Sequence, residues 1–134
     1  MLNQDSRQAS SLRADVRSEL ARISQLAETL LGRSPLLKGS LYRQRVHCGK
    51  PSCRKCRSGE RHLRWRLSRQ EQGKTVSYRV RKEEREALLG QIARWRECRK
   101  AVQELRASLR RLIEAGKALV EVREVVPVKK GRKG

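Results

Sequence analysis

Four residues of the types that commonly act as metal ligands lie within one short segment of the chain. The segment reads Cys48-x₄-Cys53-x₂-Cys56 and is followed by His62. Three thiolates and one imidazole form a tetrahedral ligand set for Zn²⁺, and four protein ligands leave no open coordination position. The sequence therefore predicts one structural zinc ion held by Cys48, Cys53, Cys56 and His62.

Two other interpretations of the cysteines stay open. The spacing Cys-x₄-Cys-x₂-Cys also begins plant-type [2Fe–2S] sites, for which Cys98 is the available fourth ligand. Cys98 falls in an apolar helical pattern, however, where a free cysteine serves as a small hydrophobic side chain. The thiols could also carry no metal. If a metal binds, His47 is the alternative to His62 as the fourth ligand.

The remaining motifs do not predict catalysis. Pro51-Ser-Cys53-Arg-Lys-Cys56 resembles the Pro-Cys-x-x-Cys box of zinc deaminases with one residue inserted, but the upstream His-x-Glu is missing. The sequence also lacks a Gly-x₄-Gly-Lys-Ser/Thr phosphate loop. We expect a protein that is not an enzyme, with no catalytic residue and no organic cofactor.

Positive charge is concentrated in the middle of the chain. The whole chain has 34 Lys and Arg against 14 Asp and Glu, and residues 38–82 alone hold 15 of the basic and 2 of the acidic residues. An exposed face that serves only solubility mixes both signs of charge. A field of one sign favours phosphate backbones, so we expect a nucleic-acid partner, DNA or RNA.

The period of the apolar residues is two in this basic segment. Leu63, Trp65 and Leu67 alternate with polar residues, and after the turn 71–74 so do Val76, Tyr78 and Val80. This pattern predicts a β-hairpin with one apolar face. We expect both aromatic residues, Trp65 and Tyr78, to belong to the core rather than to a base-stacking surface.

A third strand is expected at residues 40–47, with Tyr42 and Val46 on the apolar face. The opposite face would then be rich in arginine, and the ligand loop adds further cations. The predicted nucleic-acid contacts are Arg43, Arg45, Lys50, Arg54, Lys55, Arg64, Arg66, Arg79 and Arg81.

Apolar residues recur at steps of three and four on either side of this module, which indicates two amphipathic helices, 1–33 and 83–126. In the second helix, one heptad position holds Leu88, Trp95, Val102 and Leu109, and another holds Cys98, Leu105, Leu112 and Leu119. Each helix has one apolar seam, so we expect the two to pack as a coiled-coil-like hairpin. A homodimer or a partner protein is the alternative way to cover the seams. Gly116 is a candidate interruption of the second helix.

The predicted fold class is α+β, with a zinc-stapled antiparallel β module between two long helices. The predicted segments are a helix at 1–33, a basic module at 38–82, a long helix at 83–126 and a disordered basic tail at 127–134. No segment has the roughly 18 apolar residues of a membrane span, and the N-terminus has no apolar signal region. We expect a cytoplasmic protein that does not bind membranes.

Several of these elements together resemble a known group of proteins. Gly39-Ser-Leu-Tyr42, Cys48-Gly-Lys-Pro-Ser-Cys53-Arg and Gly59-Glu-x-His62, followed by a hairpin and a long charged helix, are similar to a family of short prokaryotic proteins classed as a domain of unknown function. The resemblance spans roughly residues 39–115. Members usually have Cys-x-Cys at the second cysteine pair, where this chain has Cys53-Arg-Lys-Cys56. The resemblance implies a fold, and an association with mobile-element neighbourhoods, but no activity.

The sequence thus predicts a small basic nucleic-acid-binding protein with a structural zinc site. Binding would rest mainly on phosphate contacts from an arginine-rich β face. The alternative is a coiled-coil adaptor that recruits a partner protein, associated with mobile-element machinery.

Overall fold

The computed structural model describes residues 4–125 and 127, which form two compact units. Residues up to 32 and from 100 onward belong to one unit, the helical unit, and residues 33–99 form the other, the β unit. Apart from Pro127, the predicted basic tail lies outside the described residues. In the described part of the chain, no helix is both long and apolar enough to cross a membrane.

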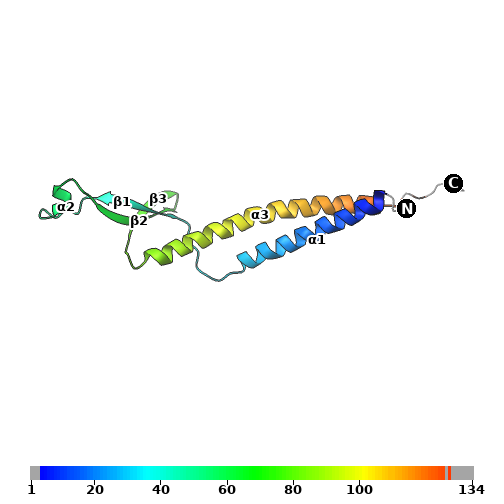
Figure 1. Cartoon of the computed structure of the whole chain (residues 1–134), viewed down its shortest axis with the longest axis horizontal. Helices are drawn as coiled ribbons and strands as arrows, with labels where there is room; N and C mark the ends of the chain where they lie inside the picture. Colours follow the sequence, from blue (N-terminus) through cyan, green and yellow to red (C-terminus); the bar gives the residue numbers. More distant parts are fainter. Residues whose placement is uncertain (1–3, 126, 128–134) are drawn as a thin grey trace. The chain divides into compact units, whose positions relative to one another are not determined.

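The β unit contains a three-stranded antiparallel sheet in the order β1-β2-β3 (Figure 1). The strands are β1 (Ser40–Val46), β2 (His62–Glu71) and β3 (Lys74–Val80). Gln72 and Gly73, both with positive φ (51° and 79°), form the two-residue turn between β2 and β3, as the twist of a hairpin favours. The predicted hairpin and third strand are therefore confirmed.

The β1–β2 register corrects the predicted faces of β1. Arg43 lies opposite Trp65, and Tyr42 lies opposite Arg66. Directly paired residues of antiparallel strands point to the same face, so Arg43 and Arg45 share the face of Trp65, and Tyr42 lies on the other. The predicted placement of Tyr42 and Val46 on the apolar face was wrong by one residue.

Cation–π contacts explain how arginine is accommodated beside the tryptophan. The guanidinium carbon of Arg43 lies 5.0 Å from the centre of the Trp65 ring, and that of Arg85 lies 5.1 Å from it. Such contacts are favourable within about 6 Å, and the alkyl part of arginine packs well on apolar surface. An alternating pattern alone does not distinguish this arrangement from an apolar face.

The core of the β unit is small. Leu67 and Val80 of the sheet pack with Ile92 of helix α3 (Arg85–Arg123), and partly buried apolar residues surround them. These are Leu37, Leu41, Trp65 and Leu88. Tyr78 is 43% exposed and donates a hydrogen bond to Glu71, so the prediction that it is a core residue was wrong. Because so little apolar surface is buried, we expect the β unit to need a further source of stability besides its core.

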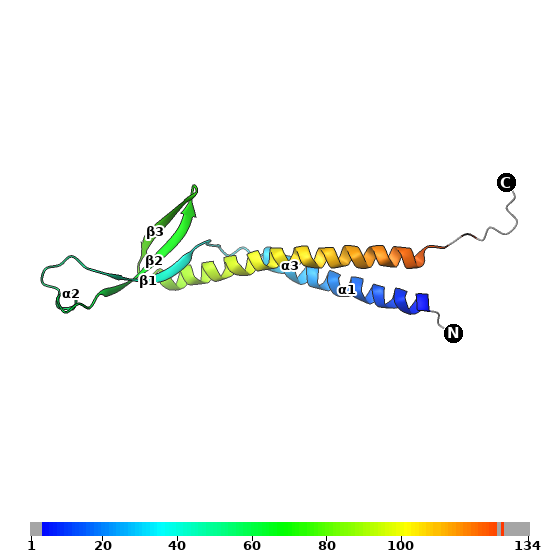
Figure 2. The same ribbon diagram turned by 90° about the horizontal axis from the view of Figure 1, so that it is seen from above.

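The helical unit pairs α1 (Gln4–Leu30) with the C-terminal part of α3, side by side and antiparallel (Figures 1 and 2). Arg22 forms an ion pair with Glu104, and Arg111 Nε donates a hydrogen bond to Glu19 over 2.6 Å. Both predicted helices are therefore present. Gly116 does not interrupt α3, which continues to Arg123.

The side chains of α3 that face α1 differ in part from those predicted. Ala101 and Ser108 are buried, whereas Val102 and Leu109, predicted at a seam position, are 50% and 41% exposed. Small side chains take these two inward positions, and the larger apolar residues one step along the helix stay exposed. Leu105 and Leu112, at the other predicted seam position, are half-buried.

A polar cluster in the helix pair gives a pH-dependent prediction. Glu19 accepts hydrogen bonds from Arg111 and from Ser108, whose side chain is fully buried. The hydrogen bond from Arg111, and then that from Ser108, lower the pKa of Glu19 below its ordinary value of 4.5. A carboxyl with a lowered folded-state pKa contributes stability above its unfolded pKa, and this is lost as the pH falls through the folded pKa.

We therefore expect Glu19→Gln to lower the Tm at pH 7 by roughly 4 °C, and the deficit to shrink at an acidic pH well below 4.5. Thermal melts followed by circular dichroism measure it. Glu28→Gln, at an exposed position of the same helix, is the control and should melt like the wild type at both pH values. An equal deficit for Glu19→Gln at both pH values would contradict the role of its charge.

Candidate metal centre

The candidate ligands lie where β1 ends and β2 begins. Val46 and His62 are paired across the two strands. The connection between them leaves the sheet as a loop with a single helical turn, α2 (Arg54–Arg57) (Figure 2). The antiparallel pair therefore brings the start and the end of this loop close together.

Local backbone geometry folds the loop over itself. Cys53 precedes α2 in an extended conformation, its N–H donates to Lys50 O over 3.1 Å, and its carbonyl accepts from Arg57 N over 3.1 Å. Gly49 and Gly59, on either side, have φ of 76° and 88°, which glycine adopts without strain. These turns point Cys48, Cys53 and Cys56 toward one another.

The ligand atoms form a compact cluster. The Sγ atoms of Cys48, Cys53 and Cys56 and a ring nitrogen of His62 all lie within 4.8 Å of one another, and all four residues are half-buried. Cys53 Sγ is 3.1 Å from His62 Nε2, and Cys56 Sγ is 3.6 Å from Cys48 Sγ. Two sulfurs bound tetrahedrally at about 2.3 Å are roughly 3.8 Å apart. The cluster is therefore compact enough to be compatible with a metal site.

Hydrogen bonds favour ionisation of one of the thiols, Cys53. A hydrogen bond from the backbone of Cys56, and then one with the His62 side chain, lower the pKa of Cys53 to about 6. At Cys56 the backbone N–H of Cys48 lowers the pKa, but burial and the neighbouring thiols outweigh it and raise the pKa. Three thiolates at this distance repel one another, so a cation is needed for all three to ionise together.

The alternative ligands lie outside this cluster. His47 is exposed, whereas His62 completes the set. Cys98, the fourth ligand required by the iron–sulfur interpretation, is half-buried on α3 and is not a member of the cluster. The geometry is thus compatible with a Cys₃His metal site.

The predicted nucleic-acid residues occupy four places in the β unit. Arg64, Arg79 and Arg81 line one hollow, together with Trp65. Arg66 is on the polar face, where its Nε donates to Ser77 Oγ over 2.8 Å. The other residues are exposed: Arg43 and Arg45 on the tryptophan face of β1, and Lys50, Arg54 and Lys55 in the ligand loop.

Two further cations that the sequence interpretation omitted, Lys82 and Arg85, line the same hollow. We call it the basic hollow, and its charged residues are Arg64, Arg79, Arg81, Lys82, Glu83 and Arg85. The available signal was Arg81-Lys82 directly after the alternating strand, with Arg85 close by. Lys82 and Arg85 were not selected because they lie beside Glu83 and Glu84, which indicated a helix start.

The fold and site define a class: a basic three-stranded β module with a Cys₃His cluster, joined to long helices. Residues 14–89 match the model of the family named Domain of unknown function (DUF6788). The match covers more than half of the chain, which therefore belongs to this family, and the predicted membership of a family of unknown function is confirmed. Comparison with curated proteins and with solved structures found no match.

Proposed function

We propose that this protein binds nucleic acid through the β unit, which is held together by a structural zinc ion. The observation that carries the proposal is the basic hollow. Its lining combines five cationic side chains with one acidic side chain, Glu83. A concave surface with so large an excess of one sign attracts a phosphodiester backbone.

Contacts within the β unit favour some cations over others as phosphate ligands. Arg79 and Arg81 are exposed, and no hydrogen bond or ion pair to another described side chain engages them. The guanidinium of Arg66, in contrast, donates to both the hydroxyl and the carbonyl of Ser77. We therefore assign phosphate contacts to the hollow and give Arg66 a supporting role in the sheet.

Zinc is the metal that fits the ligand set best. Thiolate and imidazole ligands in a tetrahedral arrangement suit Zn²⁺, and four protein ligands close the site to substrate. The ion would tie the loop to the β1–β2 pair in a unit that has a small core. We infer a structural role and no catalytic one.

We further propose that α1 and the C-terminal part of α3 pack as a coiled-coil-like hairpin. Support comes from the regular spacing of the least exposed side chains. On α3, buried Ala101 and Ser108 are one heptad apart and alternate with half-buried Leu105 and Leu112. Steps of four and three are the coiled-coil period.

Fluorescence anisotropy with labelled single-stranded and duplex DNA and RNA tests the function. If about four phosphates are neutralised, affinity should fall roughly 10²-fold between 50 and 200 mM salt. Absence of binding at low salt, or binding that does not respond to salt, would contradict the proposal. Absence of binding would favour the adaptor hypothesis, in which the helices recruit a partner protein.

A further inference from the structure

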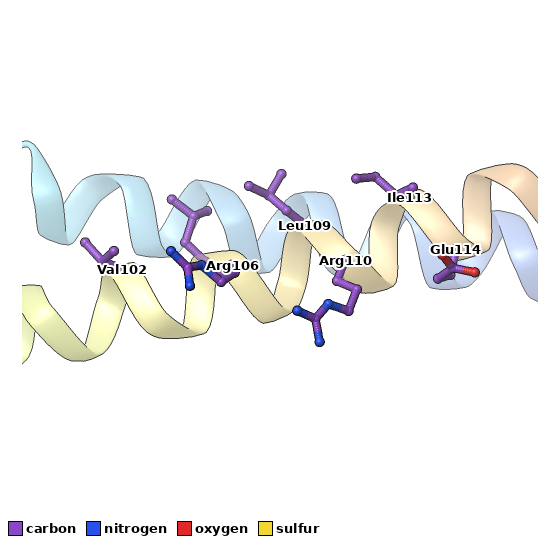
Figure 3. Close-up of a pocket in the computed structure, with 7 residues that line it drawn as sticks. Val102, Arg106, Leu109, Arg110, Ile113 and Glu114 are labelled. Carbon is purple, nitrogen blue, oxygen red and sulfur yellow. The ribbon is translucent and has the colours of Figure 1, made fainter.

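Apolar side chains of α3 remain exposed along one stripe of the helical unit. Val102, Leu109, Ile113 and Val120 are 50%, 41%, 53% and 67% exposed. In Figure 3 the first three project from one side of the helix, Arg106 and Glu114 lie along it, and Arg110 extends from the other side of the ribbon in this view. These six residues, together with Leu105, line one shallow groove. We call the row 102, 106, 109, 113, 116, 120 the outer stripe.

The outer stripe has the spacing of a second helix-packing seam. Its steps alternate between four and three residues, as the steps of the inner row 101, 105, 108, 112 do. Each outer position follows an inner one in the sequence, which places the two rows about 100° apart around the helix. A helix with two such rows can pack against two neighbours, as in four-helix bundles. Within the chain, α1 contacts α3 through Ser108 of the inner row and through Glu104 and Arg111 beside it.

The side chains of the outer stripe match those of a second, antiparallel copy of the same stripe. About a two-fold axis level with residue 111, Leu109 meets Ile113 and Val102 meets Val120. The long side chain of Arg106 meets Gly116, which leaves room for it. Two-fold dimers use the same patch on both subunits, so this self-matching order is what such an interface requires. We infer that the outer stripe pairs with that of a second copy of this chain, antiparallel.

The charges beside the stripe support the same occupant. The two-fold axis places Glu114 of one copy level with position 108 of the other, so Arg106 and Arg110 of that copy lie two residues to either side. Two residues correspond to about 3 Å along a helix. The acidic residue of the groove would thus face both of its arginines across the interface, and opposite charges there fix orientation.

Sedimentation equilibrium of the full chain, treated with nuclease and in 0.15 M salt, tests the inference. The wild type should have twice the chain mass of 15.5 kDa at tens of micromolar. Leu109→Glu should be monomeric under the same conditions, with at least a tenfold weaker association. Leu89→Glu is the matched control, because it is the same change at a similarly exposed leucine of α3 (45%) in the other unit, and it should stay dimeric. Far-UV circular dichroism should show equal helix content in all three.

A charge exchange then distinguishes specific antiparallel pairing of two outer stripes from nonspecific hydrophobic association. Glu114→Arg alone should weaken the dimer, because all three flanking side chains become positive. Adding Arg106→Glu and Arg110→Glu to it should restore association. A wild type that remains monomeric at 100 micromolar, which would leave the stripe to a different protein, overturns the inference. The inference is also overturned if Leu109→Glu remains dimeric, or if the triple charge exchange fails to restore the association that Glu114→Arg weakens.

Discussion

Neutralising three arginines of the basic hollow is expected to weaken nucleic-acid binding roughly 10²-fold at 0.1 M salt. The variant is Arg64→Gln, Arg79→Gln and Arg81→Gln, and all three residues line the hollow. Each lost phosphate contact should reduce the slope of log affinity against log salt by about 0.9. The slope should therefore become shallower by between about 2 and 3. Anisotropy titrations at several salt concentrations measure both quantities.

The matched control lowers the net charge by the same amount in the helical unit. Three exposed arginines of α1 are changed to glutamine: Arg7, Arg13 and Arg17. If the hollow is the interface, the salt slope of this control should equal that of the wild type, and its affinity should change much less. Equal losses in the two triple variants would show that net charge alone attracts the nucleic acid, without a defined interface. Arg66 is left intact in both variants because it bonds to Ser77.

Removal of one metal ligand is expected to destabilise the β unit strongly. Cys56→Ser takes one thiolate from the cluster, and the three remaining ligands should no longer retain the ion. A metal present at about a thousand times its dissociation constant stabilises the folded state by about 4 kcal/mol. For a unit of this size we expect the Tm to fall by about 15 °C or more. A chelator should have the same effect on the wild type.

Tryptophan fluorescence can follow this unit selectively, because Trp65 and Trp95 both belong to it. The control is Cys98→Ser, which removes the one cysteine outside the cluster and should leave the fluorescence transition nearly unchanged. If the chelated wild type melts like the untreated protein, the metal has no structural role. A large loss of metal from Cys98→Ser would instead favour the iron–sulfur interpretation.

The metal cluster could be predicted from the sequence because its ligands lie within fifteen residues of chain. Spacing along one loop nearly determines which side chains can meet, whatever the rest of the fold does. The alternation of Leu63, Trp65 and Leu67 was equally informative, since one buried face fixes the phase of a strand. The two strands of the hairpin were therefore placed correctly.

The phase of β1 could not be read in the same way. Tyr42 and Val46 suggested an apolar face, yet Arg43 lies over the Trp65 ring and Tyr42 shares a hydrogen bond with Ser77. Arginine and tyrosine both have an apolar part and a polar end, so either can lie on either face. The face of each β1 residue is decided by the residue of β2 with which it pairs, and this register cannot be read from a single sequence.

The inner face of α3 was misjudged for a related reason. Hydrophobicity favoured Val102 and Leu109, but close approach of two helices favours small residues such as Ala101 and Ser108. Ser108 is acceptable there because Glu19 accepts its hydrogen bond. Which side chains of α3 face α1 therefore depends on Glu19 of α1, which the sequence of α3 alone does not show.

The zinc content of the purified full chain tests the central claim most directly. Elemental analysis, together with an absorption spectrum, should give one zinc ion per chain and no visible absorption, for the wild type and for Cys98→Ser alike. A chain that holds no metal after exposure to zinc, or one that holds iron with visible charge-transfer bands, would contradict the account of the Cys₃His site.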